Sequence, residues 1–170
     1  MKGPAKRAKI LIRSLEPDDA EGLARLQSLP GYRYGTLRPP YPTVASVREF
    51  LEKRAPDDLH LGAFIDGRLV GSAGLHRSAG RRSHAAVLGI GVADDVRRRG
   101  IGDTLMVALI DAADGWLDIR RIELTVFHDN AEAIHLYEKH GFKHEGFLRA
   151  YAFREGEYVD VVAMARLRGV

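Results

Sequence analysis

A basic, glycine-bearing segment between a strand and a helix constrains the fold of this chain more than any other feature. Residues 85–92 form an almost continuously apolar run, which predicts a strand buried on both faces near the centre of a sheet. A polar, arginine-rich loop follows at 94–102. Apolar residues then recur at helical spacing from 101 to 116. The sequence therefore predicts a strand–loop–helix unit whose loop carries positive charge.

This loop has the chemistry of an anion site. Backbone N–H groups are unpaired at the start of a helix, and the helix dipole adds positive potential there. Glycines let a ligand approach the backbone closely, and arginines add forked donors. The residues concerned are Arg97, Arg98, Arg99, Gly100, Ile101, Gly102 and Asp103. We interpret the loop as a pyrophosphate cradle, although three consecutive arginines are also typical of a solvated surface cluster.

Two nucleotide-binding motifs are excluded at this loop. No Gly-Lys-Ser/Thr follows, as a Walker loop requires. The run from Gly100 to Leu105 also lacks the third glycine of the dinucleotide fingerprint.

The other segments predict a chain of the order β-αα-βββ-α-β-α-ββ, in one domain over residues 1–170. Asp66-Gly67 is a two-residue hairpin signal, and 31–42 is a tyrosine-rich segment that we expect to be a loop. Residues 1–9 are expected to be a flexible basic leader. Strands are expected at 10–13, 59–65, 69–75, 85–92, 122–126, 142–152 and 158–167, and helices at 17–29, 44–55, 101–116 and 130–140.

Composition excludes several function classes. The chain has no cysteine, which removes disulfides, thiolate metal sites and a cysteine nucleophile. Its formal net charge of +3 is too small for a nucleic-acid-binding footprint. No apolar run has the length of a signal peptide or a membrane span. A cytoplasmic protein without nucleic-acid or membrane partners is expected.

Two motifs in order resemble those of the GCN5-related N-acetyltransferase (GNAT) superfamily. Arg97-Arg98-Arg99-Gly100-Ile101-Gly102 is similar to its Arg/Gln-x-x-Gly-x-Gly/Ala motif. The second signature carries Asn130, Ala133, Tyr137 and Gly141-Phe142. The resemblance covers nearly the whole chain. Residues 120–165 and 81–84 are most similar to bacterial L-amino acid N-acetyltransferases.

The resemblance implies an α/β (α+β) fold with a mixed, mostly antiparallel sheet. We expect about seven strands flanked by about four helices, with strands 4 and 5 splayed apart. The pantetheine arm of acetyl-CoA would lie in that gap against the backbone of Ile90, Gly91 and Val92, and the amides from Arg97 to Asp103 would hold the pyrophosphate. Glycines in a strand favour such a distortion, or else mark close side-chain packing.

The resemblance also implies roles for individual side chains. Tyr137 matches the family tyrosine that protonates the departing CoA thiolate. Asn130 matches a polar position that contacts the cofactor, and its alternative role is to cap the helix. Glu123 and His84 are candidates for the base that deprotonates the amine. No metal ion is expected.

The acceptor is expected to meet a polar-aromatic wall formed by Tyr32, Tyr34 and Thr36. Together these assignments predict an acetyl-CoA-dependent N-acetyltransferase that passes the acetyl group directly to a small-molecule amine. The acceptor expected first is the α-amine of a small L-amino acid. The alternatives are a peptide or protein N-terminus, a polyamine, or an acyl-CoA-binding module without turnover. A homodimer is a further expectation from the family.

Overall fold

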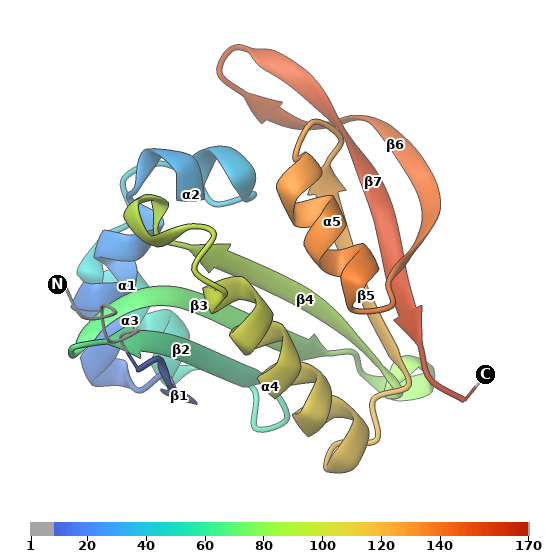
Figure 1. Cartoon of the computed structure of the whole chain (residues 1–170), viewed down its shortest axis with the longest axis horizontal. Helices are drawn as coiled ribbons and strands as arrows, with labels where there is room; N and C mark the ends of the chain where they lie inside the picture. The colour runs from blue at the N-terminus through green and yellow to red at the C-terminus, as the bar shows by residue number, and fades with distance from the viewer. Residues whose placement is uncertain (1–8, 170) are drawn as a thin grey trace, which may run out of the picture.

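The computed structural model describes residues 9–169, which form a seven-stranded sheet with helices on both faces (Figure 1). Of the predicted leader, only Lys9 lies within the described residues. The strands are β1 (Leu11–Ser14), β2 (Leu59–Ile65), β3 (Arg68–Arg77), β4 (Ala85–Val92), β5 (Arg121–Phe127), β6 (Lys143–Arg154) and β7 (Glu157–Leu167). The helices are α1 (Ala20–Gln27), α2 (Pro30–Gly35), α3 (Val44–Glu52), α4 (Ile101–Gly115) and α5 (Ala131–Lys139), with 3-10 turns η1 (Pro17–Asp19), η2 (Gly80–Arg82) and η3 (Asp94–Val96).

The strand order is β1-β2-β3-β4-β5-β7-β6, and one pair in it is parallel. That pair is β4 and β5, which are in register only from Ala85–Arg121 to Val87–Glu123. Beyond this point both strands continue, to Val92 and Phe127, without pairing with each other. The expected mixed, mostly antiparallel sheet with a splay between strands 4 and 5 is therefore confirmed.

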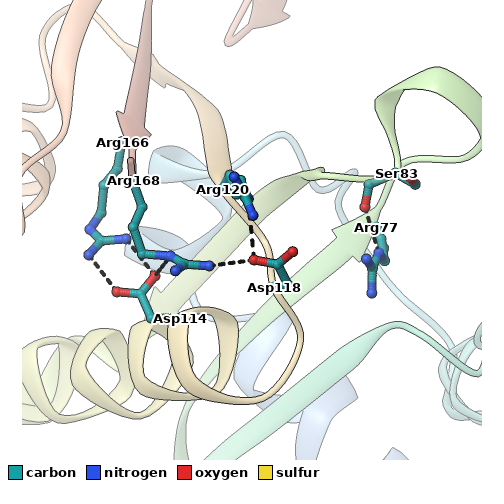
Figure 2. A network of polar contacts seen from close by, with 7 residues as sticks. All are labelled: Arg77, Ser83, Asp114, Asp118, Arg120, Arg166 and Arg168. Atoms are coloured by element: carbon teal, nitrogen blue, oxygen red, sulfur yellow. Dashed lines mark hydrogen bonds and ion pairs between the residues drawn. The ribbon is translucent and has the colours of Figure 1, made fainter. Parts of the chain in front are cut away.

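Ion pairs close the narrow end of this splay. The His84 carbonyl accepts the backbone N–H groups of Arg120 and Arg121, which holds the start of β4 to β5. Beside it, Asp114 at the end of α4 receives both terminal nitrogens of Arg166 at 2.9 and 2.7 Å (Figure 2). Arg168 bridges Asp114 and Asp118, at 3.2 and 2.9 Å (Figure 2). α4, β5 and β7 are thus joined where the strands meet, and the sheet opens toward the other end.

Adjacent residues of β3 show which helices cover which face, because neighbouring side chains on a strand point to opposite sides. A Cβ on Gly71 would meet Ile101 and Leu105 of α4. Ser72, the next residue, pairs with Gly91, where a Cβ would meet Tyr32 of α2. α4 and α2 therefore lie on opposite faces, and both reach the open end of the splay.

Two expectations from the sequence are corrected here. The segment 31–42 is not wholly a loop, because α2 runs from Pro30 to Gly35 and makes five α-helices in the described residues instead of about four. Proline suits the first turn of a helix, so Pro30 initiates one despite the glycines around it. Residues 85–92 are not buried on both faces throughout. Only Ala85 and Ala86 are consecutively buried, and Val87 is exposed although β4 still pairs with β5 at this residue.

The turn prediction at Asp66-Gly67 is confirmed. Both residues have positive φ, at 49° and 78°, as a type I′ hairpin turn requires. Glu155 and Gly156 join β6 to β7 in the same way, at 51° and 90°. The β6–β7 hairpin brings its tip to the open end of the sheet, near α2 (Figure 1).

Candidate active site

A cleft of about 1460 Å³ lies where β4 and β5 separate. Five parts of the chain contribute to its walls. They are α2 with the loop that follows it, the end of β4, the η3–α4 junction, the end of β5 with α5, and the tip of the β6–β7 hairpin. Ile90, Gly91 and Val92, which the family resemblance places at the gap, line it from the end of β4.

The cleft has an anion-binding end at the start of α4. Gly100 stands before the helix with φ of 81°, and no side chain caps the helix. The first N–H groups of α4 are therefore available to a ligand, and Arg97 and Arg98 line the cleft beside them. Gly100, Ile101, Gly102 and Asp103 line it as well, whereas Arg99 does not. This arrangement can hold a pyrophosphate.

Two aspartates fix the loop that leads into α4. Asp94 accepts the N–H of Gly31 at 2.8 Å, which joins the loop to the first turn of α2. Asp95 receives both terminal nitrogens of Arg68, at 2.7 and 2.8 Å. The acidic residues of this loop therefore position it. Asp94 also pairs with Arg97 at 3.6 Å, and Arg97 and Arg98 both line the cleft.

Tyr32 crosses the end of β4 on the face opposite α4. Its ring lies directly over Gly91, where a Cβ would come within 2.1 Å of the ring carbon Cε2. Its hydroxyl forms a buried hydrogen bond of 3.0 Å with the Ser72 hydroxyl on β3. Burial raises the pKa of Tyr32 above its ordinary value. One interpretation of the strand glycines was close side-chain packing, and the Tyr32 ring packs in this way against Gly91. The same ring lines the cleft.

Tyr137 reaches the same region from α5. It is 7% exposed and packs against Phe142, and it lines the cleft. Its hydroxyl has no hydrogen-bond partner among residues 9–169. Burial, and then the neighbouring Tyr32, raise the pKa of Tyr137. The phenol therefore stays protonated at neutral pH and can donate a proton to a ligand.

Asn130 has the capping role that was one of the two considered from the sequence. It is the N-cap of α5, and its Oδ1 accepts the N–H of Ala133 at 3.2 Å. It also lines the cleft. The preceding Asp129 is not the cap, because Arg154 engages its carboxylate.

Arg154 is a site residue that the sequence reasoning missed. Its guanidinium donates to both carboxylate oxygens of Asp129, at 3.2 and 2.5 Å. It also stacks over the rings of Tyr34 and Phe127, with its central carbon 3.9 and 4.5 Å from their centroids. The side chain is 13% exposed. Arg154 thus joins the hairpin tip, the end of β5 and α2 into one wall of the cleft.

This wall was not visible in the sequence, because Arg154 lies 25 residues from Asp129 and 120 from Tyr34. Tyr34 and Thr36, which the sequence placed near the acceptor, both line the cleft. The Thr36 hydroxyl accepts the N–H of Arg38 at 3.4 Å, and Arg38 lines the same wall.

His84 and Glu123 lie outside the lining of the cleft. His84 immediately precedes β4 at the closed end, and Val92 lies at the opposite end of that strand, roughly 26 Å away at the usual rise per residue. Glu123 is held by Arg82 and Arg121 at 2.6 and 2.7 Å. Burial acts to raise the pKa of Glu123, but the hydrogen bonds and charges of the two arginines together outweigh it, so the pKa is lowered. The structure therefore does not bring either candidate base to the other site residues.

Residues 24–142 match the acetyltransferase (GNAT) family. The chain is 41% identical to the L-amino acid N-acetyltransferase AaaT of Escherichia coli (strain K12) over 95% of this chain and 99% of that protein. Together, the family match and this identity show that the chain belongs to the GNAT family and is an N-acetyltransferase.

Solved structures agree with this assignment. The GNAT-family acetyltransferase of Streptococcus pneumoniae superposes with a TM-score of 0.81 at 31% identity, covering 95% of this chain and 100% of that one. The spermidine N-acetyltransferase of Vibrio cholerae, solved in complex with CoA and spermine, gives a TM-score of 0.83 at 25% identity. Its match covers 93% of this chain and 95% of that one.

Within residues 9–169, every helix falls short of the length and apolar character that crossing a membrane requires.

Proposed function

We propose that this protein transfers an acetyl group from acetyl-CoA directly to the α-amine of a small L-amino acid. The observation that carries the proposal is the arrangement of one cleft. An uncapped helix start with two arginines lies at one end, and two buried tyrosines, Tyr32 from α2 and Tyr137 from α5, line the same cleft. The identity of 41% with an L-amino acid N-acetyltransferase supports the acceptor class.

The donor would lie along the gap between β4 and β5. Arg97, Arg98 and the first amides of α4 would hold its pyrophosphate. Because β4 has no partner on its β5 side beyond Val87, backbone groups near Ile90 and Val92 are free to pair with the pantetheine arm. A backbone amide there would also stabilise the oxyanion of the tetrahedral intermediate.

Tyr137 would protonate the departing CoA thiolate. Its hydroxyl has no protein partner among residues 9–169, it is protonated at neutral pH, and it lines the cleft beside α4. Tyr32 has a different task, because its hydroxyl is already bonded to Ser72. It would form the floor against which the acetyl group and the acceptor meet. We propose no role in transfer for His84 or Glu123, since neither lines the cleft.

The wall of α2 and its following loop supports an amino-acid acceptor. Tyr34, Leu37 and Phe127 give it apolar surface for a side chain. Arg38 forms no ion pair among the described residues, whereas the nearby Arg154 is occupied by Asp129. Arg38 would therefore bind the α-carboxylate. A polyamine has no carboxylate, and the positive charge of Arg38 opposes its binding.

The test is an acceptor screen that follows thiol release from acetyl-CoA. The panel holds L-amino acids, the amide of each active amino acid, spermidine and an unblocked peptide. We expect activity with amino acids and a KM at least about ten-fold higher for the matching amides, because they lack the carboxylate. Arg38→Gln should remove that difference. Activity confined to spermidine or to the peptide would contradict the proposed acceptor.

A further inference from the structure

A second cluster of chemically active side chains lies away from the cleft, on the α3 side of the sheet. His60 on β2 pairs with Gly74 on β3, so His76, two residues further along β3, points to the same face. Asp58 comes from the turn just before β2. A carboxylate oxygen of Asp58 and one ring nitrogen from each histidine all lie within 4.8 Å of one another.

His60, a member of this cluster, carries an unsatisfied polar atom. The residue is 5% exposed, and its buried Nε2 has no hydrogen-bond partner. A buried nitrogen without a partner costs free energy, on the order of 1–3 kcal/mol. The ring is held by Phe50, which packs edge-on at 5.0 Å, and by His76, whose ring centroid is 4.9 Å away. A ligand for this nitrogen would remove the cost.

The absence of a side chain at Gly74 makes room for the His60 ring. A Cβ at this position would lie 3.0 Å from His60 Nδ1 and 3.2 Å from the carbonyl oxygen of Leu59. The imidazole therefore sits close against the backbone of β3, which limits its movement. Ligands held in place before binding lose little entropy when a metal ion arrives.

Asp58 is oriented as a metal ligand would be. Its Oδ1 accepts the N–H of Arg77 at 3.0 Å, and its Oδ2 lies 3.1 Å from His76 Nδ1. Two ligand atoms on one tetrahedral zinc ion are roughly 3.3 Å apart, given zinc–nitrogen bonds of about 2.0–2.1 Å. The present separation is close to that value. The bond from Arg77 supplies the second contact that ligating carboxylates usually have.

The charges around the cluster set the expected affinity. Asp58 and two neutral imidazoles give a divalent ion one negative charge. Arg54 lies nearby, with its guanidinium bound to the Leu15 carbonyl at 2.7 Å, and Arg38 stacks over Phe50 at 5.3 Å. These positive charges oppose a cation, so binding should be weaker than at a closed four-ligand zinc site.

We propose that Asp58, His60 and His76 form a binding site for a divalent transition-metal ion such as Zn²⁺. Two imidazoles and a carboxylate suit zinc and its neighbours, and water would complete the coordination. The ion would join the start of β2, the end of β3 and the turn before β2. None of the three ligands lines the acetyl-transfer cleft, although Arg38 lies near both sites, and the proposal does not depend on the acceptor proposed above.

The test uses the full chain without an affinity tag, stripped with a chelator and titrated with Zn²⁺ by calorimetry and with Co²⁺ by visible absorption. We expect one saturable ion per chain and a rise in the thermal unfolding midpoint. His76→Gln and Asp58→Asn should each weaken Zn²⁺ binding by more than about ten-fold. His144→Gln removes an exposed, carboxylate-paired histidine and should bind as the wild type does.

Circular dichroism of each metal-free variant shows whether it folds, and if one fails, the other decides the outcome. No saturable binding by the wild type would overturn the proposal. So would equal Zn²⁺ binding by the folded variants and the wild type, because the ion would then be held adventitiously elsewhere.

Discussion

Gly91 has only a hydrogen atom where other residues carry a side chain, and this determines the packing at the centre of the cleft. Any larger side chain would occupy the space of the Tyr32 ring, whose Cε2 would be 2.1 Å from the new Cβ. Tyr32 would have to move away and lose its hydrogen bond to Ser72. The absence of a side chain at Gly91 therefore lets the Tyr32 ring of α2 pack against β4, the strand along which we propose that acetyl-CoA binds.

We expect Gly91→Ala to destabilise the protein by about 1–3 kcal/mol, the usual cost of overpacking a buried site. Urea unfolding measures this change. Gly89→Ala is the matched control, since a Cβ at Gly89 meets nothing within 4 Å. Its effect should stay within about 1 kcal/mol. Equal stabilities for the two variants would contradict the packing described for Tyr32.

Tyr137→Phe tests the proposed acid. The variant keeps the buried ring but removes the hydroxyl, so kcat should fall by roughly ten- to a thousand-fold. Acetyl-CoA affinity, measured by calorimetry, should change little. Tyr158→Phe, at an exposed tyrosine of β7 outside the cleft, should keep wild-type turnover. Unchanged turnover in Tyr137→Phe would remove this residue from the mechanism.

At the scale of elements, Asp103 joins the start of α4 to the end of α5. Its carboxylate pairs with Lys139 and accepts a hydrogen bond from His140, whose Nε2 is 2.7 Å away. These two partners, Lys139 first, lower the pKa of Asp103. The carboxylate is therefore ionised in the folded protein at pH values where it is protonated in the unfolded chain.

The sign of the pH effect follows from that pKa. The stabilisation by Asp103 is fully present above the ordinary carboxyl pKa of 3.8 and is lost as the pH falls through the lower folded value. Asp103→Asn should therefore reduce stability by a constant amount near neutral pH and by progressively less below about pH 4.

Urea unfolding across this pH range, without cofactor, measures the difference from the wild type. Asp111→Asn, on the exposed side of the same helix, is the control. A difference that persists unchanged at low pH would argue against the ion pairs of Asp103.

Local pattern accounts for the elements that the sequence predicts well. The Asp66-Gly67 turn, the helix after Gly100 and the strand at 85–92 each depend on residues close together in the chain. α2 was missed because its Pro-Gly-Tyr composition is typical of a loop, and the contact of Tyr32 with β4 is long-range.

The residues of the site could be predicted from the sequence to about the same extent as the helices and strands. The anion-binding loop and Tyr137 lie within short motifs, and the structure places both at the cleft. The wall around Arg154 brings together three segments distant in the chain. No local pattern contains such a contact, so only the fold could reveal it.

At the scale of the whole molecule, the sheet is a wedge with one closed and one open end. The Asp114, Arg166 and Arg168 ion pairs join α4 to β7 at the closed end. The positive charges relevant to the cofactor are concentrated at the open end, which the formal net charge of +3 does not show. The wedge would bring the proposed donor groove and the proposed acceptor wall into one cavity.

Because the chain has no cysteine, we expect a particular order of substrate binding and product release. Without a thiol to carry the acetyl group, transfer would pass from the CoA sulfur to the amine while both substrates occupy the cleft. A covalent acetyl-enzyme would instead release CoA before the amine binds.

Initial velocities measured over a grid of acetyl-CoA and amino-acid concentrations test this central claim most directly. Direct transfer in a ternary complex predicts double-reciprocal lines that intersect. Parallel lines, together with release of CoA in the absence of any acceptor, would show an acetyl-enzyme intermediate and contradict the account.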